Sequence, residues 1–105
     1  MNGDRAYVCR LLDIYGNALS ARQRDVVDLY YNEDLSLAEI SEHCGITRQG
    51  VRDAIRHAVE ALETLENALG FSKKSEKVAA IAAKIASSDD VSEMRKLAES
   101  IVGEL

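Results

Sequence analysis

The sequence contains no proline, and this absence is the first guide to its fold. Proline interrupts helices, and here the β-branched residues are interleaved with Ala, Leu, Glu and Arg, which are compatible with helices. No apolar run approaches the roughly 20 residues of a transmembrane helix, so we expect no membrane insertion. The opening residues, MNGDRAYVCRLL, lack the apolar core of a signal peptide. The composition therefore predicts an all-α protein of the cytoplasm.

Cysteine is also scarce, and its spacing argues against a metal site. Cys9 and Cys44 are isolated and form no CxxC pair, so we expect two small buried hydrophobic residues in a reducing compartment. A zinc site with His43 and His57 is the alternative. Because His43 and Cys44 are adjacent, they point to different faces of a helix, and no other residue has ligand spacing. The sequence predicts neither a metal nor a cofactor.

Apolar spacing and helix caps predict three helices before residue 45. The first covers about residues 4–15 and ends at Gly16-Asn17. Ser20 with Gln23 fits a capping box, in which the serine accepts a hydrogen bond from the backbone N–H three residues on and the side chain there reaches back. The helix that follows stops near Asn32, and Ser36 with Glu39 forms a second capping box. The residues expected to face inward are Val8, Leu11, Leu12, Tyr15, Val26, Val27, Leu29, Tyr30, Leu37, Ile40 and Cys44.

A fourth helix is predicted from its cap, Thr47, to Gly70. At 1.5 Å per residue it would be roughly 33 Å long, about twice what a helix that reads a DNA groove needs. Its spacing of three and four residues indicates one packing surface, the seam Val51, Ile55, Ala58, Val59, Leu62, Leu65 and Leu69.

After Gly70 the composition changes, and the segment FSKKSEK is interpreted as a short hinge. Two further amphipathic helices follow, separated by SSDD, which supplies a new cap. We therefore divide the chain into a domain over residues 1–71 and a C-terminal helical hairpin over residues 72–105. Neither hairpin helix has enough partner surface alone, so we expect the hairpin to pack on the long helix or in a dimer.

The stretch LSLAEISEHCGITRQGVRDAIRHA carries the strongest functional signal. It reads as two helices joined by a turn at Gly45, where a left-handed backbone conformation is expected. Ile46 is expected to enter the core, and Thr47 to cap the second helix. This pattern is a helix-turn-helix, which lays its second helix into the major groove of a duplex.

The predicted nucleic-acid site lies on the first turns of that second helix. Arg48, Arg52 and Arg56 recur every four residues and should form an exposed stripe opposite the Val51–Ile55 seam. Arginine reads guanine edges and Gln49 suits adenine, while the hydroxyl of Thr47 can reach a phosphate. Gly50 either eases approach to a groove or avoids a clash with the preceding helix. The alternative is a solvated helix face that pairs with nearby carboxylates.

The charge balance limits this prediction. The chain has 13 Lys and Arg against 18 Asp and Glu, and residues 36–60 have three Arg against four acidic residues. Positive charge is therefore local. With three phosphate contacts, the logarithm of the binding constant would fall with the logarithm of the salt concentration with a slope of only about −2.7, which we call the salt slope. A dimer, or a partner that brings its own nucleic acid, would compensate for such weak binding.

The residues from Leu19 to Leu62, LSARQRDVVDLYYNEDLSLAEISEHCGITRQGVRDAIRHAVEAL, resemble the fourth region of sigma-70-type factors. The chain as a whole is similar to the YlxM family of small bacterial proteins, whose recognition helix also opens with a Ser/Thr-Arg-Gln triplet. The resemblance implies a DNA-binding or regulatory protein and a link to the signal recognition particle pathway. It points to Thr47, Arg48, Gln49 and Arg52 as site residues.

These observations lead to one reading and one alternative. The first is a homodimeric regulator that binds nucleic acid, with DNA favoured over RNA, and has a possible partner in the signal recognition particle. The alternative is a protein-interaction adaptor that keeps the helix-turn-helix scaffold without reading DNA. No catalytic constellation or phosphate-binding loop is visible, so we do not expect an enzyme.

Overall fold

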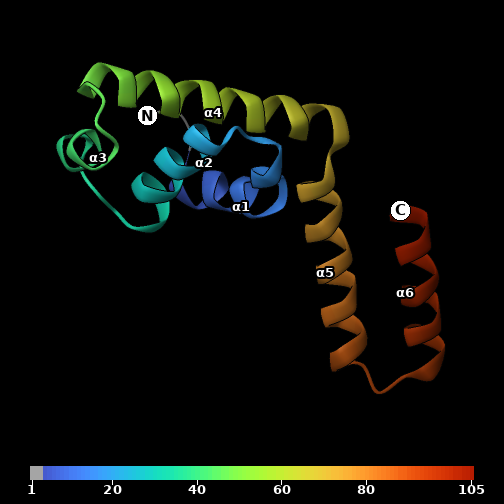
Figure 1. The fold of residues 1–105 in the computed structure, drawn as a ribbon. Coiled ribbons are helices and arrows are strands. Elements are labelled where there is room, and N and C mark those ends of the chain that lie inside the picture. Colours follow the sequence, from blue (N-terminus) through green and yellow to red (C-terminus); the bar gives the residue numbers. More distant parts are fainter. Residues whose placement is uncertain (1–3) are drawn as a thin grey trace. The chain divides into compact units, whose positions relative to one another are not determined.

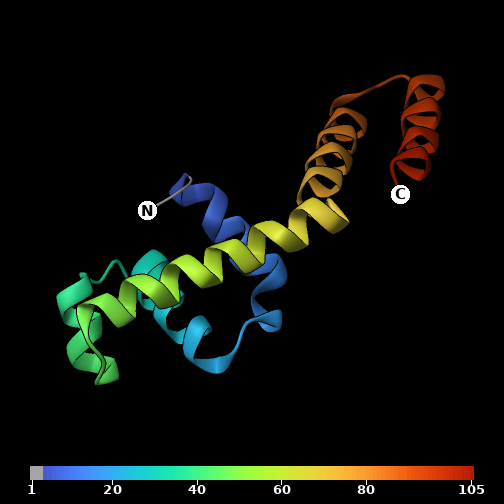
Figure 2. The ribbon, with the colours of Figure 1, turned by 90° about the horizontal axis from the view of Figure 1, so that it is seen from above.

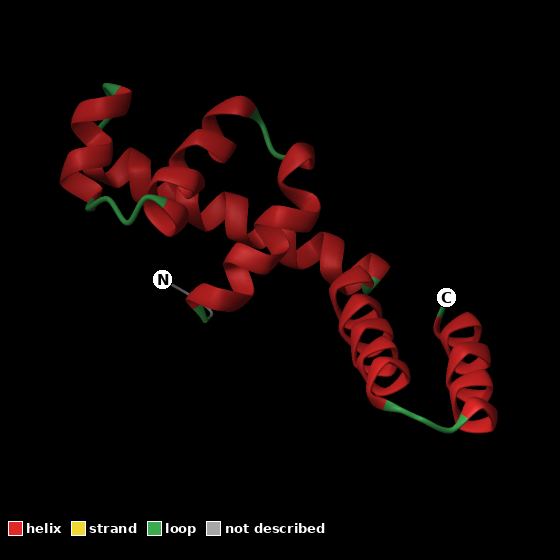
Figure 3. Ribbon diagram, turned by 90° about the horizontal axis from the view of Figure 1, so that it is seen from below, coloured by secondary structure: helices red, strands yellow, loops and turns green. Residues whose placement is uncertain are grey.

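The structure is a computed structural model that describes residues 4–105, and these residues fold into six α-helices (Figure 1). Helices account for almost all of the described chain, with short loops between them and no strand in that part (Figure 3). The predicted all-α fold is confirmed. The chain divides into two compact units, residues 1–69 and 70–105, which are described separately.

The first unit contains four α-helices in the order that the sequence predicts. These are α1 (Arg5–Tyr15), α2 (Ala21–Val27), α3 (Leu37–Cys44) and α4 (Arg48–Leu69). A 3-10 turn, Gly16–Ala18, follows α1, and a π-helical turn, Asp28–Asn32, follows α2. Both predicted capping boxes are present, at Ser20 with Gln23 and at Ser36 with Glu39.

The core of this unit forms where α4 lies across α1 and α2 (Figure 2). The fourth helix has 22 residues, as predicted, and its apolar seam is buried from Val51 to Leu62. Leu65 is half-buried, but Leu69 is 57% exposed, so the buried part of the seam stops short of the predicted end. The buried apolar residues are Val8, Leu11, Leu12, Tyr15, Val26, Val27, Tyr31, Ile40, Val51, Ile55, Ala58, Val59 and Leu62.

One charged residue is buried in this core, and the apolar pattern did not reveal it. Glu66 is only 5% exposed, and its Oε1 accepts a hydrogen bond of 2.8 Å from the hydroxyl of Tyr15. A buried carboxylate requires hydrogen-bond donors, and this tyrosine supplies one from α1. The bond therefore joins α1 to the C-terminal half of α4.

The second unit is a hairpin of α5 (Phe71–Ser87) and α6 (Val91–Glu104). The segment FSKKSEK is the start of α5, so the predicted hinge is wrong. The change of composition there introduces no residue that breaks a helix, and Gly70 alone, with φ of +63°, separates α4 from α5. The predicted cap in SSDD is present, because Asp90 Oδ1 accepts from the backbone N–H groups of Ser92 and Glu93.

Two predictions about cysteines and membranes can be compared with the structure. Cys9 and Cys44 are free thiols, and each is half-buried instead of fully buried. Among residues 4–105, no helix combines the length and apolar character needed to cross a bilayer.

Two core tyrosines provide a test of this packing. The hydroxyl of Tyr31 is buried without a hydrogen-bond partner among the described residues, and burial raises the pKa of this group above its ordinary value. We expect Tyr31→Phe to keep or increase the free energy of unfolding, because an unpaired buried polar group costs about 1–3 kcal/mol. Tyr15→Phe removes one donor to buried Glu66 and should cost about 1.5–3 kcal/mol, the range for a hydrogen bond to a charged group. Urea denaturation of both variants measures the difference, and equal destabilisation would contradict this assignment.

Candidate nucleic-acid interface

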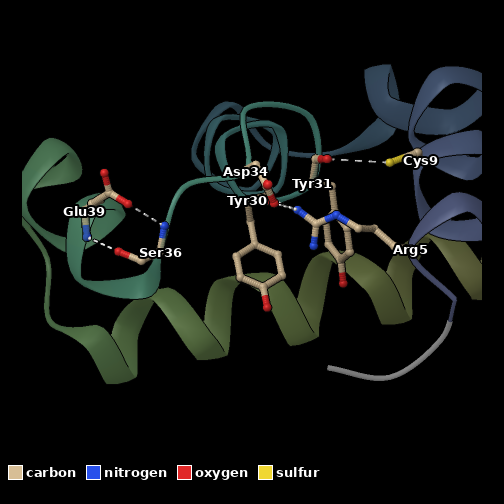
Figure 4. Close-up of polar contacts among 7 residues, drawn as sticks. All are labelled: Arg5, Cys9, Tyr30, Tyr31, Asp34, Ser36 and Glu39. Carbon is tan, nitrogen blue, oxygen red and sulfur yellow. Dashed lines mark hydrogen bonds and ion pairs between the residues drawn. The ribbon is translucent and has the colours of Figure 1, made fainter.

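The connection that leads into α3 is held in place by side chains of α1. The π-helical turn closes with one i→i+5 bond to the Asp28 carbonyl, and the carbonyls of the residues after Asp28 have no donor at that spacing. The backbone N–H groups of Glu33 and Leu35 donate to the carbonyls of Asp28 and Leu29. The carbonyls of Tyr30 and Tyr31 instead accept from Arg5 and from the Cys9 thiol (Figure 4).

Arg5 makes several contacts at this point. Its Nη2 donates to the Tyr30 carbonyl at 2.5 Å and to Asp34 Oδ1 at 2.7 Å. Its guanidinium carbon lies 5.3 Å from the ring centres of both Tyr30 and Tyr31, within range of a cation–π interaction. Asp34 has a φ of 60°, an unusual conformation for a residue other than glycine. The sequence analysis did not identify Arg5, because its partners lie 25 and 29 residues away.

The third helix begins and ends with local hydrogen bonds. Ser36 Oγ accepts from the backbone N–H of Glu39 at 3.1 Å, and Glu39 Oε1 accepts from the backbone N–H of Ser36 at 2.9 Å. The helix ends at Gly45, which has the expected left-handed conformation, with φ of +67°. The backbone N–H groups of Gly45 and Ile46 both donate to the Ser41 carbonyl. The turn is therefore tied back onto α3.

The fourth helix starts directly after this turn. Thr47 Oγ1 accepts from the backbone N–H of Gly50 at 2.9 Å, which confirms the predicted cap. A Cβ on Gly50 would lie 3.2 Å from Thr47 Oγ1 and 3.7 Å from Ile46 Cβ. The absence of a side chain at Gly50 thus makes room for the turn itself, and not for the preceding helix as predicted, since the nearest atoms belong to Ile46 and Thr47. Ile46 is half-buried against the core.

The five predicted site residues lie on one helix end and are all exposed: Thr47, Arg48, Gln49, Arg52 and Arg56. Asp53 engages two of them. Gln49 Nε2 donates to Asp53 Oδ1 at 3.1 Å, and Arg56 Nη2 lies 3.3 Å from the same oxygen. Among the described residues, no hydrogen bond or ion pair involves the guanidinium of Arg48 or Arg52. These two cations are the ones available to an anionic ligand.

A groove of about 260 Å³ runs along the side of α4 from Gln49 to Glu63. Arg52 and Arg56 line it at one end, Ile55 and Val59 supply its apolar part, and Glu60 and Glu63 line the other end. Carboxylates repel phosphates, so the surface suited to nucleic acid does not extend past Arg56, and Asp53 interrupts it between Arg52 and Arg56. Among residues 4–105, no group of three His, Cys, Asp or Glu side chains is placed to hold a metal ion.

The capping box of α3 gives a prediction about pH. Two hydrogen bonds with Ser36 hold the pKa of Glu39 below its usual value. The larger effect comes from the backbone N–H of Ser36 and the smaller from its side chain. A carboxylate with a lowered folded pKa stabilises the fold above its ordinary pKa, and that stabilisation is lost as pH falls through the lowered value. We expect the amide NMR signal of Ser36 to shift as the pH falls through the lowered pKa of Glu39.

The chain contains its own control for this titration. Ser20 N–H donates to Gln23 Oε1 in the same kind of box, and an amide does not titrate. The Ser20 signal should therefore not report such a titration, and Glu39→Gln should remove it from Ser36 while keeping the acceptor. A Ser36 shift that persists in Glu39→Gln would contradict the assignment.

Comparison with known proteins identifies the family. Residues 3–101 match the model of the UPF0122 family, described as "Putative helix-turn-helix protein, YlxM / p13 like". A UPF0122 protein of Clostridium kluyveri is 44% identical over 75 residues, which cover 71% of this chain and 68% of the relative. One from Caldanaerobacter subterraneus is 42% identical over 78 residues, covering 74% of this chain and 67% of the relative.

A third relative, a UPF0122 protein of Acetivibrio thermocellus, is 46% identical over 72 residues, with 68% of this chain and 62% of the relative covered. The family description names a helix-turn-helix protein and no enzymatic activity. These matches confirm the resemblance to YlxM. The chain belongs to the UPF0122 family of YlxM- and p13-like helix-turn-helix proteins.

Proposed function

We propose that this protein is a regulatory protein that binds nucleic acid, with DNA favoured over RNA, through the first turns of α4. The observation that carries the proposal is the pair Arg48 and Arg52. Both are exposed at the start of a helix that follows a helix-turn-helix turn, and neither has an acidic partner among the described residues. Arginine at this position is suited to guanine edges and phosphates.

The remaining site residues have supporting roles in this proposal. Thr47 lies at the helix start, where backbone N–H groups and the helix dipole favour a phosphate. Arg56 and Gln49 are held by Asp53, so each must leave that carboxylate before it contacts a ligand. Arg48 and Arg52 therefore make the first contacts, and Arg56 and Gln49 add to them.

The charge of the first unit explains why we propose a homodimer. Residues 1–69 carry 7 basic and 12 acidic residues, and hence the whole net charge of −5. With three phosphate contacts, one copy would bind weakly, with a salt slope of about −2.7, and two copies on one duplex would double that slope. A link to the signal recognition particle rests on the family resemblance. An RNA target there would have to present a loop or bulge, since the major groove of an RNA duplex is deep and narrow.

A protein-interaction adaptor is the second candidate, and the groove on α4 favours it. The carboxylates that line it, Asp53, Glu60 and Glu63, fit a basic protein segment better than a nucleic acid. The two candidates differ in their response to salt. Nucleic-acid binding should weaken steeply with ionic strength because counterions are released from the phosphates, whereas a short ion-paired protein segment should respond less.

The test removes both available cations with Arg48→Ala and Arg52→Ala in one variant. Binding to a labelled random-sequence DNA duplex, followed by fluorescence anisotropy, should weaken at least tenfold, and the slope of log K against log salt should fall by about 1.8 per copy. Thermal stability should not change, because both side chains are exposed. Unchanged affinity and slope would refute the site.

The matched control removes two exposed positive charges elsewhere, by Lys84→Ala with Lys96→Ala. It should retain the affinity of the unaltered protein to within about twofold. A tagged pull-down with and without nuclease then separates the two candidates. A protein partner that survives both nuclease and the double arginine change would favour the adaptor, and sequence-enriched DNA lost with that change would favour the regulator.

A further inference from the structure

Asp53 lies at the centre of the exposed face of α4. At about 100° per residue, it is about 200° from both Val51 and Ile55, which are fully buried, and opposite buried Leu62. Its side chain is 42% exposed. A helix-turn-helix lays the outward face of its second helix into a groove. The proposed function therefore turns this carboxylate toward the bases of a duplex.

The two oxygens of this carboxylate differ in their contacts. Oδ1 accepts from Gln49 Nε2 at 3.1 Å and from Arg56 Nη2 at 3.3 Å. Oδ2 accepts no hydrogen bond from any residue in the described part of the chain. When Gln49 and Arg56 turn to a ligand, Asp53 loses both of its donors. It then needs a donor from the duplex, because an ionised carboxylate can only accept hydrogen bonds.

Few groups of a DNA duplex can supply that donor. The phosphate oxygens are negatively charged acceptors, and in the major groove guanine N7 and O6 and thymine O4 are acceptors as well. The donors there are the amino groups of cytosine and adenine, and aspartate is suited to the N4 amino group of cytosine. Asp53 therefore opposes most placements of α4 on a duplex and is compatible with one that puts a cytosine beside it.

We propose that Asp53 is a specificity-determining residue that selects a cytosine in the major groove. This inference rests on the proposed function and deepens it by naming a base that the site selects. Asp53 lowers the affinity for every duplex, because it repels phosphates and holds Arg56 and Gln49. Part of that affinity returns where the cytosine amino group reaches the carboxylate. Arg48 and Arg52 supply the attraction, and Asp53 restricts the sequences on which it is effective.

Glu60 offers a matched comparison on the same helix. It lies seven residues after Asp53, and two helical turns bring it back to nearly the same face. It lines the acidic end of the groove, and its carboxylate makes no hydrogen bond or ion pair with the five predicted site residues. Glu60→Ala thus removes the same charge as Asp53→Ala, but from beyond the surface suited to nucleic acid.

The experiment first uses the unaltered full chain to select duplexes from a random-sequence DNA library. Each C·G pair of the enriched duplex is then replaced in turn by T·A. Fluorescence anisotropy measures the binding of the unaltered, Asp53→Ala and Glu60→Ala proteins to every duplex. Thymine presents the O4 acceptor where cytosine presents its amino donor, so the carboxylate beside that base is left without a partner. Circular dichroism at 222 nm confirms that each variant is helical.

We expect one of these replacements to weaken the binding of the unaltered protein by about fivefold or more. In Asp53→Ala the same replacement should change the affinity by less than about twofold, because the group that reads the cytosine is gone. The affinity of Asp53→Ala for the random-sequence duplex should rise by about threefold or more, since a repulsive charge is lost and Arg56 is released. Glu60→Ala should keep the loss of about fivefold.

Equal losses in the unaltered and Asp53→Ala proteins at every pair would overturn the proposal. So would an enriched duplex with no preferred cytosine, or a preference that Glu60→Ala also removes. The double arginine variant keeps the two hypotheses apart. If it loses binding while Asp53→Ala keeps the cytosine preference, the proposed site stands and this inference fails. If the unaltered protein binds no duplex, both fail.

Discussion

The first unit depends on the burial of one face of α4. Val51, Ile55, Ala58 and Leu62 are fully buried there and touch side chains from the three preceding helices. Because the residues of a helix keep a constant angular relation, burying this face exposes Arg48, Arg52 and Arg56 on another. The same packing that stabilises the domain therefore sets the direction of the candidate site. A rotation of α4 that turned these arginines inward would also take the apolar seam out of the core.

The turn before α3 adds a second constraint, which comes from α1. Arg5 and Cys9 donate to the carbonyls of Tyr30 and Tyr31, which a π-helical turn leaves without helical partners. Asp34 then directs the chain into α3 with a positive φ while its carboxylate binds Arg5. These contacts connect the first helix to the start of the helix-turn-helix. They explain how a connection of four residues, 33–36, can hold α3 in position against α4.

Features set by neighbouring residues could be predicted from the sequence, and features set by distant residues could not. The capping boxes at Ser20 and Ser36 each need only a partner three residues away, and Gly45 follows from the turn between two periodic segments. Arg5 with Asp34 and Tyr15 with Glu66 are 29 and 51 residues apart, and nothing local marks them. The predicted hinge at FSKKSEK failed because polar composition does not end a helix, whereas Gly70 does.

The distribution of charge bears on the proposed dimer. The first unit carries the whole net charge of −5, so a single copy is repelled by a polyanion except at the start of α4. The hairpin is neutral and adds no further repulsion. The proposed dimer would hold a second α4 at high effective concentration once the first has bound. Weak contacts by Arg48 and Arg52 in each copy would then act together, which is how an acidic protein with a small cationic surface can bind a duplex.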